Sequence, residues 1–153
     1  MITARHIMST EFHSLQPGTT IADAAKEFKY ASEKEGRRVF GMMVIENEKL
    51  VGILSMYDLL LFLQPKHVHI WGEMSDLDIS GLFENISAKT KDIRVSDIMS
   101  TEVVTVEESS NVFTVLEIMN RKHIRRVPVV DNNRVLGIVY ISDLFFHLVD
   151  NIV

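Results

Sequence analysis

The five-residue word "IMSTE" occurs twice in the chain, at Ile7–Glu11 and again at Ile98–Glu102. In a chain of 153 residues, a chance repeat of this length has a probability on the order of one in a few hundred. The repeat therefore favours a chain that is built from two copies of one structural unit.

A second pair of matching segments supports this hypothesis. "KLVGILSMYDLLLFL" (Lys49–Leu63) corresponds to "RVLGIVYISDLFFHL" (Arg134–Leu148), with a glycine and an aspartate at matching places. The copies are 91 residues apart at "IMSTE" but 85 residues apart here, so the first copy has six additional residues between the two anchors. We predict two repeats, at 1–64 and 95–153, joined by a partly helical linker at 65–94.

Both copies show the same order of expected elements. A short β-rich stretch follows "IMSTE", and then come a helix, two apolar runs joined by a tight turn, and a final apolar helix. The turns fall at 46–48 and 131–133, where Asn and Asp tolerate left-handed backbone. The residues at helical spacing that indicate the first helix of each copy are Ile21, Ala24, Ala25 and Phe28, and Val112, Val115, Leu116 and Met119. The pattern predicts a β-α-β-β-α unit twice.

Each unit of roughly 55 residues buries too little apolar surface by itself. We therefore expect the two units to pack together with pseudo-two-fold symmetry in an α/β (α+β) fold. Apolar residues at helical spacing also predict an amphipathic helix in the linker, namely Ile79, Leu82, Phe83 and Ile86. After the linker, we expect Ser96 to cap a helix that carries Ile98 and Met99.

Composition limits the classes of function. A hydrophobic content of 46% fits a packed globule, and the net charge of −5, with both signs interspersed, gives no basic stripe for nucleic acid. The absence of cysteine excludes disulfides, thiolate metal sites and cysteine nucleophiles. The most apolar run, Leu59–Leu63, is far shorter than the ~20 residues of a membrane span. We expect a cytoplasmic protein.

The two copies resemble CBS domains, and the pair resembles the tandem arrangement called a Bateman module. In the second copy the resemblance rests on "VSDIMSTEVVTV", "HIRRVPVVDNNRVLGIV" and the final "SDL", and in the first on "IMSTEFHSL", "LVGIL" and "SMYDLL". It implies a regulatory pair of units that binds an adenine nucleotide such as AMP, ADP or ATP in the cleft between repeats, without catalysis. It also implies a homodimer. Sensing further needs an output partner, which the sequence does not identify, so either a separate protein reads the signal or the chain is a sensing or storage unit by itself.

The start of the last helix in each copy has two interpretations. Ser55 and Asp58 fit a capping box, and a carboxylate at a helix start is also favourable with the helix dipole. In the second copy Tyr140 replaces the serine of the box, yet Asp143 is kept. The resemblance implies that Asp143, and next Asp58, bind ribose, and that Ser142 and Ser55 contact sugar or phosphate. Tyr140 stands where the family has a small hydroxyl residue, which alters the expected phosphate geometry.

Arg125 and Arg126 precede the strand of the second hairpin. Arginines at a strand entrance are usually solvated or paired with surface acids, but beside a cleft the guanidinium fork matches phosphate oxygens. The family places basic residues here, so the resemblance implies phosphate contact. The first copy has Phe40 and Gly41 at these positions, and we expect two unequal pockets with one functional site.

Family sites also use the first strand and first helix of the partnering unit. By motif, Ser14 and Thr19 match this role for the second-copy aspartate, and Thr105 and Ser110 match it for the first-copy aspartate. The alternative is that these four hydroxyls are ordinary strand residues and helix caps.

The linker contains "KHVHIWGE", in which His67 and His69 fall on one side of an extended chain and Glu73 could complete a zinc site. Two histidines without a dependable third ligand are weak evidence. A solvated linker that places Trp71 on the core is the commoner arrangement, so we expect neither a metal nor a cofactor.

Three classes of function follow from these observations. The leading hypothesis is a regulatory, energy-sensing module in which the nucleotide shifts packing between repeats or protomers. The alternative is a ligand-free dimerisation scaffold with vestigial pockets, which Tyr140 and the missing basic pair of the first copy support. An enzyme is not expected, because the chain has no Ser-His-Asp spacing and no phosphate-cradling glycine loop.

Overall fold

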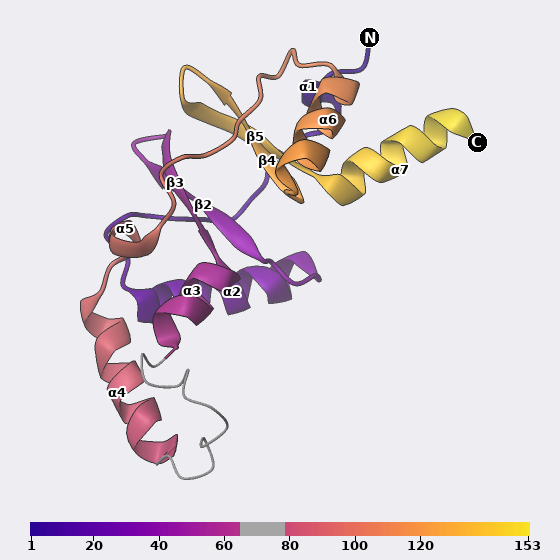
Figure 1. Cartoon of the computed structure of the whole chain (residues 1–153). Coiled ribbons are helices and arrows are strands. Elements are labelled where there is room, and N and C mark those ends of the chain that lie inside the picture. The colour runs from indigo at the N-terminus through magenta and orange to yellow at the C-terminus, as the bar shows by residue number, and fades with distance from the viewer. Residues whose placement is uncertain (65–78) are drawn as a thin grey trace. The chain divides into compact units, whose positions relative to one another are not determined.

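A computed structural model gives the structure of the protein, and it describes residues 1–64 and 79–153. The elements, shown in Figure 1, are α1 (Ala4–Ile7), β1 (Ser14–Leu15), α2 (Ile21–Glu35), β2 (Gly41–Glu46), β3 (Lys49–Ser55), α3 (Met56–Leu63), α4 (Ile79–Asp92), α5 (Val95–Ile98), α6 (Val112–Lys122), β4 (Arg126–Asp131), β5 (Arg134–Tyr140) and α7 (Ile141–Ile152). The mixed α/β fold class predicted from the sequence is confirmed, and α4 confirms the predicted linker helix.

The first helix of each copy begins at a side-chain cap. Thr20 accepts a hydrogen bond from the backbone N–H of Asp23 at the start of α2, and Asn111 accepts one from Phe113 at the start of α6. One stripe of α2 is buried through Ile21, Ala24, Phe28 and Ala31. The helical spacing also predicts that Ala25 is buried on this face, and that prediction was wrong, because the residue is exposed on the neighbouring side of the helix.

The short helix α5 corrects another prediction. Ser96 lies inside the helix, whose N-cap is Arg94, and the C-cap is Met99. The cap bond comes instead from Asp97, whose carboxylate accepts from the backbone N–H of Arg94 at 2.9 Å. Asp97, at the third helical position, therefore makes the capping bond that was predicted for Ser96.

In the first copy the strands lie in the order β1-β2-β3, and in the second copy β5 pairs with β4. β1 is parallel to β2, whereas β4 and β5 are antiparallel. Both predicted hairpin turns are confirmed, and each has two consecutive residues with positive φ: Asn47 and Glu48 in the first, and Asn132 and Asn133 in the second. Two positive φ values in a two-residue turn match the twist of the flanking strands.

The chain divides into two compact units that do not coincide with the sequence repeats. Unit 1 contains Met1–His13, Ile45–Leu50 and Glu102–Val153, and unit 2 contains Ser14–Val44 and Val51–Thr101. Each unit therefore contains the opening segment of the other repeat. The core of unit 1 includes Ala4 and Ile7 from α1, and the core of unit 2 includes Val95 from α5.

We call residues 2–9 arm 1 and residues 93–100 arm 2. Each arm is held in its unit by five backbone hydrogen bonds, and the two sets correspond one to one. Those of arm 1 are Ala4 to Ser110, Arg5 to Glu108, Val112 to Ile2, and the reciprocal pair between Ser9 and Ile138. Those of arm 2 are Val95 to Thr19, Ser96 to Pro17, Ile21 to Ile93, and the reciprocal pair between Ser100 and Ile53. The repeated "IMSTE" thus marks the end of each arm.

Two glycines make room for the arms. A Cβ atom at Gly137 would lie 2.7 Å from the carbonyl oxygen of Ser9 and 3.0 Å from Sδ of Met8. A Cβ atom at Gly52 would lie 2.6 Å from Sδ of Met99 and 2.9 Å from the carbonyl oxygen of Ser100. The glycine shared by the two repeats is therefore required by the close approach of an arm to the second strand of each hairpin.

Candidate functional site

In unit 1, the basic pair and the last helix of the second copy meet at one edge of the sheet. Arg126 is the register partner of Tyr140, and the backbone N–H of Ile141 donates to the carbonyl of Arg125 at 2.8 Å. The first turn of α7, which carries Asp143, therefore begins beside the entrance of β4. The side chains of Arg125 and Asp143 are exposed, and those of Arg126 and Tyr140 are half-buried.

The start of α7 has no side-chain cap. Tyr140 occupies the N-cap position and makes no capping hydrogen bond, which confirms that the capping box is broken in the second copy. Ser142 and Asp143 lie in the exposed first turn of the helix. Backbone N–H groups of a helix start, together with the dipole, favour a negatively charged ligand at this end.

In unit 2, the equivalent position holds a complete capping box. Oγ of Ser55 accepts from the backbone N–H of Asp58 at 3.0 Å, and Oδ2 of Asp58 accepts from the backbone N–H of Ser55 at 2.9 Å. The capping interpretation is thus confirmed for the first copy. The cap bond uses one carboxylate oxygen, so the other oxygen of Asp58 keeps its capacity to accept.

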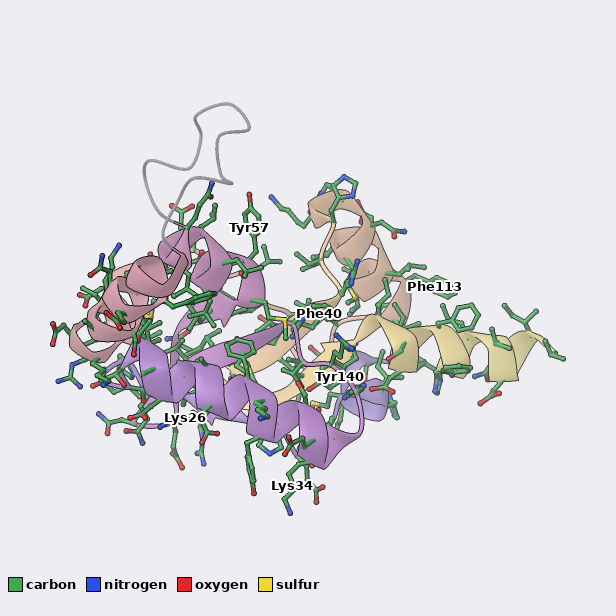
Figure 2. All side chains as sticks on the ribbon, turned by 90° about the horizontal axis from the view of Figure 1, so that it is seen from below. Lys26, Lys34, Phe40, Tyr57, Phe113 and Tyr140 are labelled. Carbon is green, nitrogen blue, oxygen red and sulfur yellow. The ribbon has the colours of Figure 1, made fainter. Side chains whose placement is uncertain are left out.

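The strand entrance of unit 2 is chemically different from that of unit 1. The backbone N–H of Met56 donates to the carbonyl of Phe40 at 2.8 Å, which is the same bond that Ile141 makes to Arg125. Phe40 and Gly41 therefore occupy the places of the two arginines, as the sequence analysis predicted. Phe40, labelled with Tyr140 in Figure 2, is 44% exposed.

The four predicted hydroxyl contacts lie in the turns and strands that follow the arms. Ser14 belongs to β1, and the carbonyl of Thr19 accepts from arm 2. Thr105 is half-buried, and Oγ of Ser110 accepts from the backbone N–H of Glu107 at 3.1 Å. Ser14 and Thr19 fall in unit 2, and Thr105 and Ser110 fall in unit 1. The predicted pairing of each hydroxyl set with an aspartate joins residues of different units and stays a prediction.

Unit 1 also contains an open groove of about 610 Å³ beside Thr105 and Ser110. Its lining includes the carboxylates Glu107, Glu108 and Asp131. Asp131 was predicted only as a turn residue and no site role was predicted for Glu107 and Glu108, although the run "EESS" at 107–110 was a visible signal. Like charges repel, so the acidic side of this groove does not suit a phosphate group.

The structure describes possible metal ligands in residues 1–64 and 79–153. Within this part of the chain, no group of three or more His, Cys, Asp or Glu side chains is arranged to hold a metal ion. His67, His69 and Glu73 of the weak zinc hypothesis, and Trp71 beside them, lie outside the described residues. No helix in the described part has the length and apolar character needed to cross a membrane.

The family model of the CBS domain matches residues 4–65 and 95–150. The chain therefore belongs to the CBS domain family, and the resemblance noted in the sequence is confirmed. The two matched segments are the two repeats of a CBS pair.

Curated relatives differ in length. YhcV of Bacillus subtilis, a CBS domain-containing protein, is 26% identical over 151 residues, which cover 99% of this chain and 89% of YhcV. The uncharacterized protein MJ1232 of Methanocaldococcus jannaschii is 28% identical over 137 residues, which cover 88% of this chain but only 35% of that protein. The chain thus spans most of one relative and about a third of the other.

Solved CBS-pair structures share the fold. CBSX2 of Arabidopsis thaliana superposes with a TM-score of 0.73 and 24% identity, covering 97% of this chain and 95% of that chain. CBSX2 in complex with AMP gives a TM-score of 0.71 and 24% identity, covering 99% of this chain and 98% of that chain. These likenesses establish the architecture of a CBS pair.

Proposed function

We propose that the chain is a regulatory CBS-pair module that binds an adenine nucleotide of the AMP, ADP or ATP class at the strand entrance and last helix of the second repeat. The observation that carries the proposal is the backbone placement of the arginine pair beside the first turn of α7, which carries Asp143. A guanidinium fork binds phosphate oxygens, and a carboxylate accepts hydrogen bonds from the hydroxyls of ribose. Residues beside the start of α7 therefore suit both the phosphate and the ribose of a nucleotide. The AMP complex of CBSX2, a protein of the same fold, supports this choice of ligand.

The residues have separate roles in this proposal. Asp143 accepts hydrogen bonds from the ribose hydroxyls, and Arg125 and Arg126 bind phosphate. Ser142 supplies a hydroxyl at the helix start that contacts sugar or phosphate. Asp58 with Ser55 forms the second candidate position, which lacks a basic pair because Phe40 occupies that place. One functional nucleotide site per chain is therefore the expected stoichiometry.

Signalling needs more than binding. A ligand shifts an equilibrium only by its differential affinity for two states, so energy sensing requires a conformational or dimer change that a separate output protein reads. The module itself performs no chemical reaction in this proposal. Its cytoplasmic location is also part of the proposal and rests on composition.

Homodimerisation is supported by apolar residues at matching positions of two helices. Leu60 and Leu61 of α3 are 64% and 51% exposed, and the matching residues of α7, Phe145 and Phe146, are 58% and 62% exposed. Tyr57 also projects outward from α3 (Figure 2). Large exposed apolar groups mark association surfaces, and a face that recurs in both copies suits a self-complementary interface between two chains.

The second candidate function is a dimerisation scaffold without a ligand. Two observations favour it: Tyr140 provides no side-chain cap at the start of α7, and Phe40 stands in place of an arginine in unit 2. Both features alter positions that are expected to contact the phosphate of a nucleotide. The exposed apolar residues needed for dimerisation, in contrast, are present in both copies.

Thermal unfolding of the wild type and of Asp143→Ala across AMP, ADP, ATP, S-adenosylmethionine and GTP distinguishes the two functions. A ligand at 100 times its dissociation constant stabilises the folded state by about 2.7 kcal/mol. We expect at least one adenosine ligand to raise the Tm of the wild type, and this rise to disappear in the variant. A flat Tm for all five ligands would favour the scaffold.

A further inference from the structure

We infer that the nucleotide controls the docking of the arm bonded to the segment that it contacts, so that this arm is the element through which binding is transmitted. The inference rests on the proposed function and adds the part of the chain that responds. It comes from the backbone bonds of the arms, which end on the same short segments that carry the predicted hydroxyl contacts.

In unit 1, one segment of six residues serves both purposes. Thr105 and Ser110 stand at its two ends and are the hydroxyls assigned to the ligand. The carbonyls of Ser110 and Glu108 accept from the backbone N–H groups of Ala4 at 2.8 Å and Arg5 at 3.0 Å. Arm 1 is thus bonded directly to the backbone of a predicted ligand segment.

In unit 2, the corresponding segment is 14–19. The carbonyl of Thr19 accepts from Val95 at 2.8 Å, and that of Pro17 accepts from Ser96 at 3.0 Å. Arm 2 follows directly on α4, and α4 contacts α2. A change in the docking of arm 2 is therefore transmitted to α4.

Ligand binding and arm docking are linked because both restrict the backbone conformation of these segments. The carbonyl acceptors lie at 17–19 and 108–110, in turns and irregular backbone, and fixing the backbone of such residues costs conformational entropy. A ligand that orders the turn lowers the remaining cost of docking the arm, which gives positive coupling without a new contact. By linkage, a docked arm raises ligand affinity by the same factor.

The first experiment uses the full chain with AMP as the probe. Calorimetry measures binding, and NMR then measures exchange of single amide hydrogens with and without saturating AMP. We expect exchange at Ala4 and Arg5, or at Val95 and Ser96, to slow about five-fold or more. The responding arm identifies the segment that holds the ligand. AMP binding with no change in either arm overturns the inference alone. If AMP does not bind, ADP and then ATP replace it as the probe, and absence of binding for all three overturns the proposed function with the inference.

Two glycine variants form a matched pair for the second experiment. Gly137→Ala places a Cβ against Met8 and Ser9 of arm 1, and Gly52→Ala does the same to arm 2 through Met99 and Ser100. We expect the variant of the responding arm to weaken AMP binding about five-fold or more, and the other variant to keep wild-type affinity. Faster exchange in the responding arm with unchanged AMP affinity in that variant contradicts the inference, because coupling is reciprocal.

Discussion

At the scale of residues, the two repeats differ most at the start of their last helices. Ser55 and Asp58 form reciprocal hydrogen bonds, whereas Tyr140 leaves Asp143 without a capping partner at the N-cap. The difference between serine and tyrosine thus distinguishes a helix start that has a capping box from one that lacks it. The basic pair of unit 1 lies beside the start that lacks the box, which is why Asp143 ranks above Asp58 as the ribose contact.

Ser55→Ala tests the capping box. The change removes the acceptor for the Asp58 N–H, so we expect the free energy of unfolding to fall by about 1 kcal/mol in urea denaturation. Ser96→Ala is the control, because Ser96 lies inside α5 and is exposed, and its expected effect is within about 0.5 kcal/mol. Equal losses in both variants would show that the box does not stabilise α3.

At the scale of elements, the first helices of the two copies end in the same backbone conformation through different residues. Gly36 ends α2 with φ at 67°, and His123 ends α6 with φ at 55°. The left-handed conformation is unstrained for glycine and costs other residues free energy. The helices are thus equivalent in geometry although their caps differ in sequence.

Gly36→Ala isolates this backbone term, because no atom lies within 4 Å of the new Cβ. We expect it to lower the free energy of unfolding by about 1 kcal/mol. Gly18→Ala is the matched control, since its Cβ also meets nothing within 4 Å and its φ is not in the left-handed range. Thermal unfolding at one scan rate compares the two, and a loss in Gly18→Ala as large as that in Gly36→Ala contradicts the explanation.

At the scale of the whole molecule, sequence reasoning predicted the two repeats and the elements but not the exchange of arms between the units. The repeat shows that Ile7 and Ile98 are equivalent, and equivalent residues fit either core, so pattern alone cannot say on which copy an arm docks. The capping box was predictable because it is local in sequence. The position of Arg125 beside α7 depends on strand register, and the acidic lining near Thr105 depends on a non-local approach of two turns.

The proposed dimer is also tested at this scale, by light scattering with size-exclusion chromatography. We expect the wild type to have twice the 17.5 kDa chain mass, and Leu60→Glu combined with Phe145→Glu to shift the protein to the monomer, because buried unpaired charges are costly. Ala25→Glu is the matched control, since Ala25 is exposed on α2, and it should leave the dimer intact. A monomeric wild type, or a dimeric double variant, contradicts this interface.

The central claim is that this CBS pair binds an adenine nucleotide through Asp143. Calorimetric titration of the wild-type chain and of Asp143→Ala with AMP tests it most directly. The account predicts saturable binding of one AMP per chain and a loss of about ten-fold or more in affinity in the variant, consistent with a charged hydrogen bond worth about 1.5–3 kcal/mol. Absence of binding of AMP, ADP and ATP to the wild type, or equal affinity in the two proteins, would contradict it.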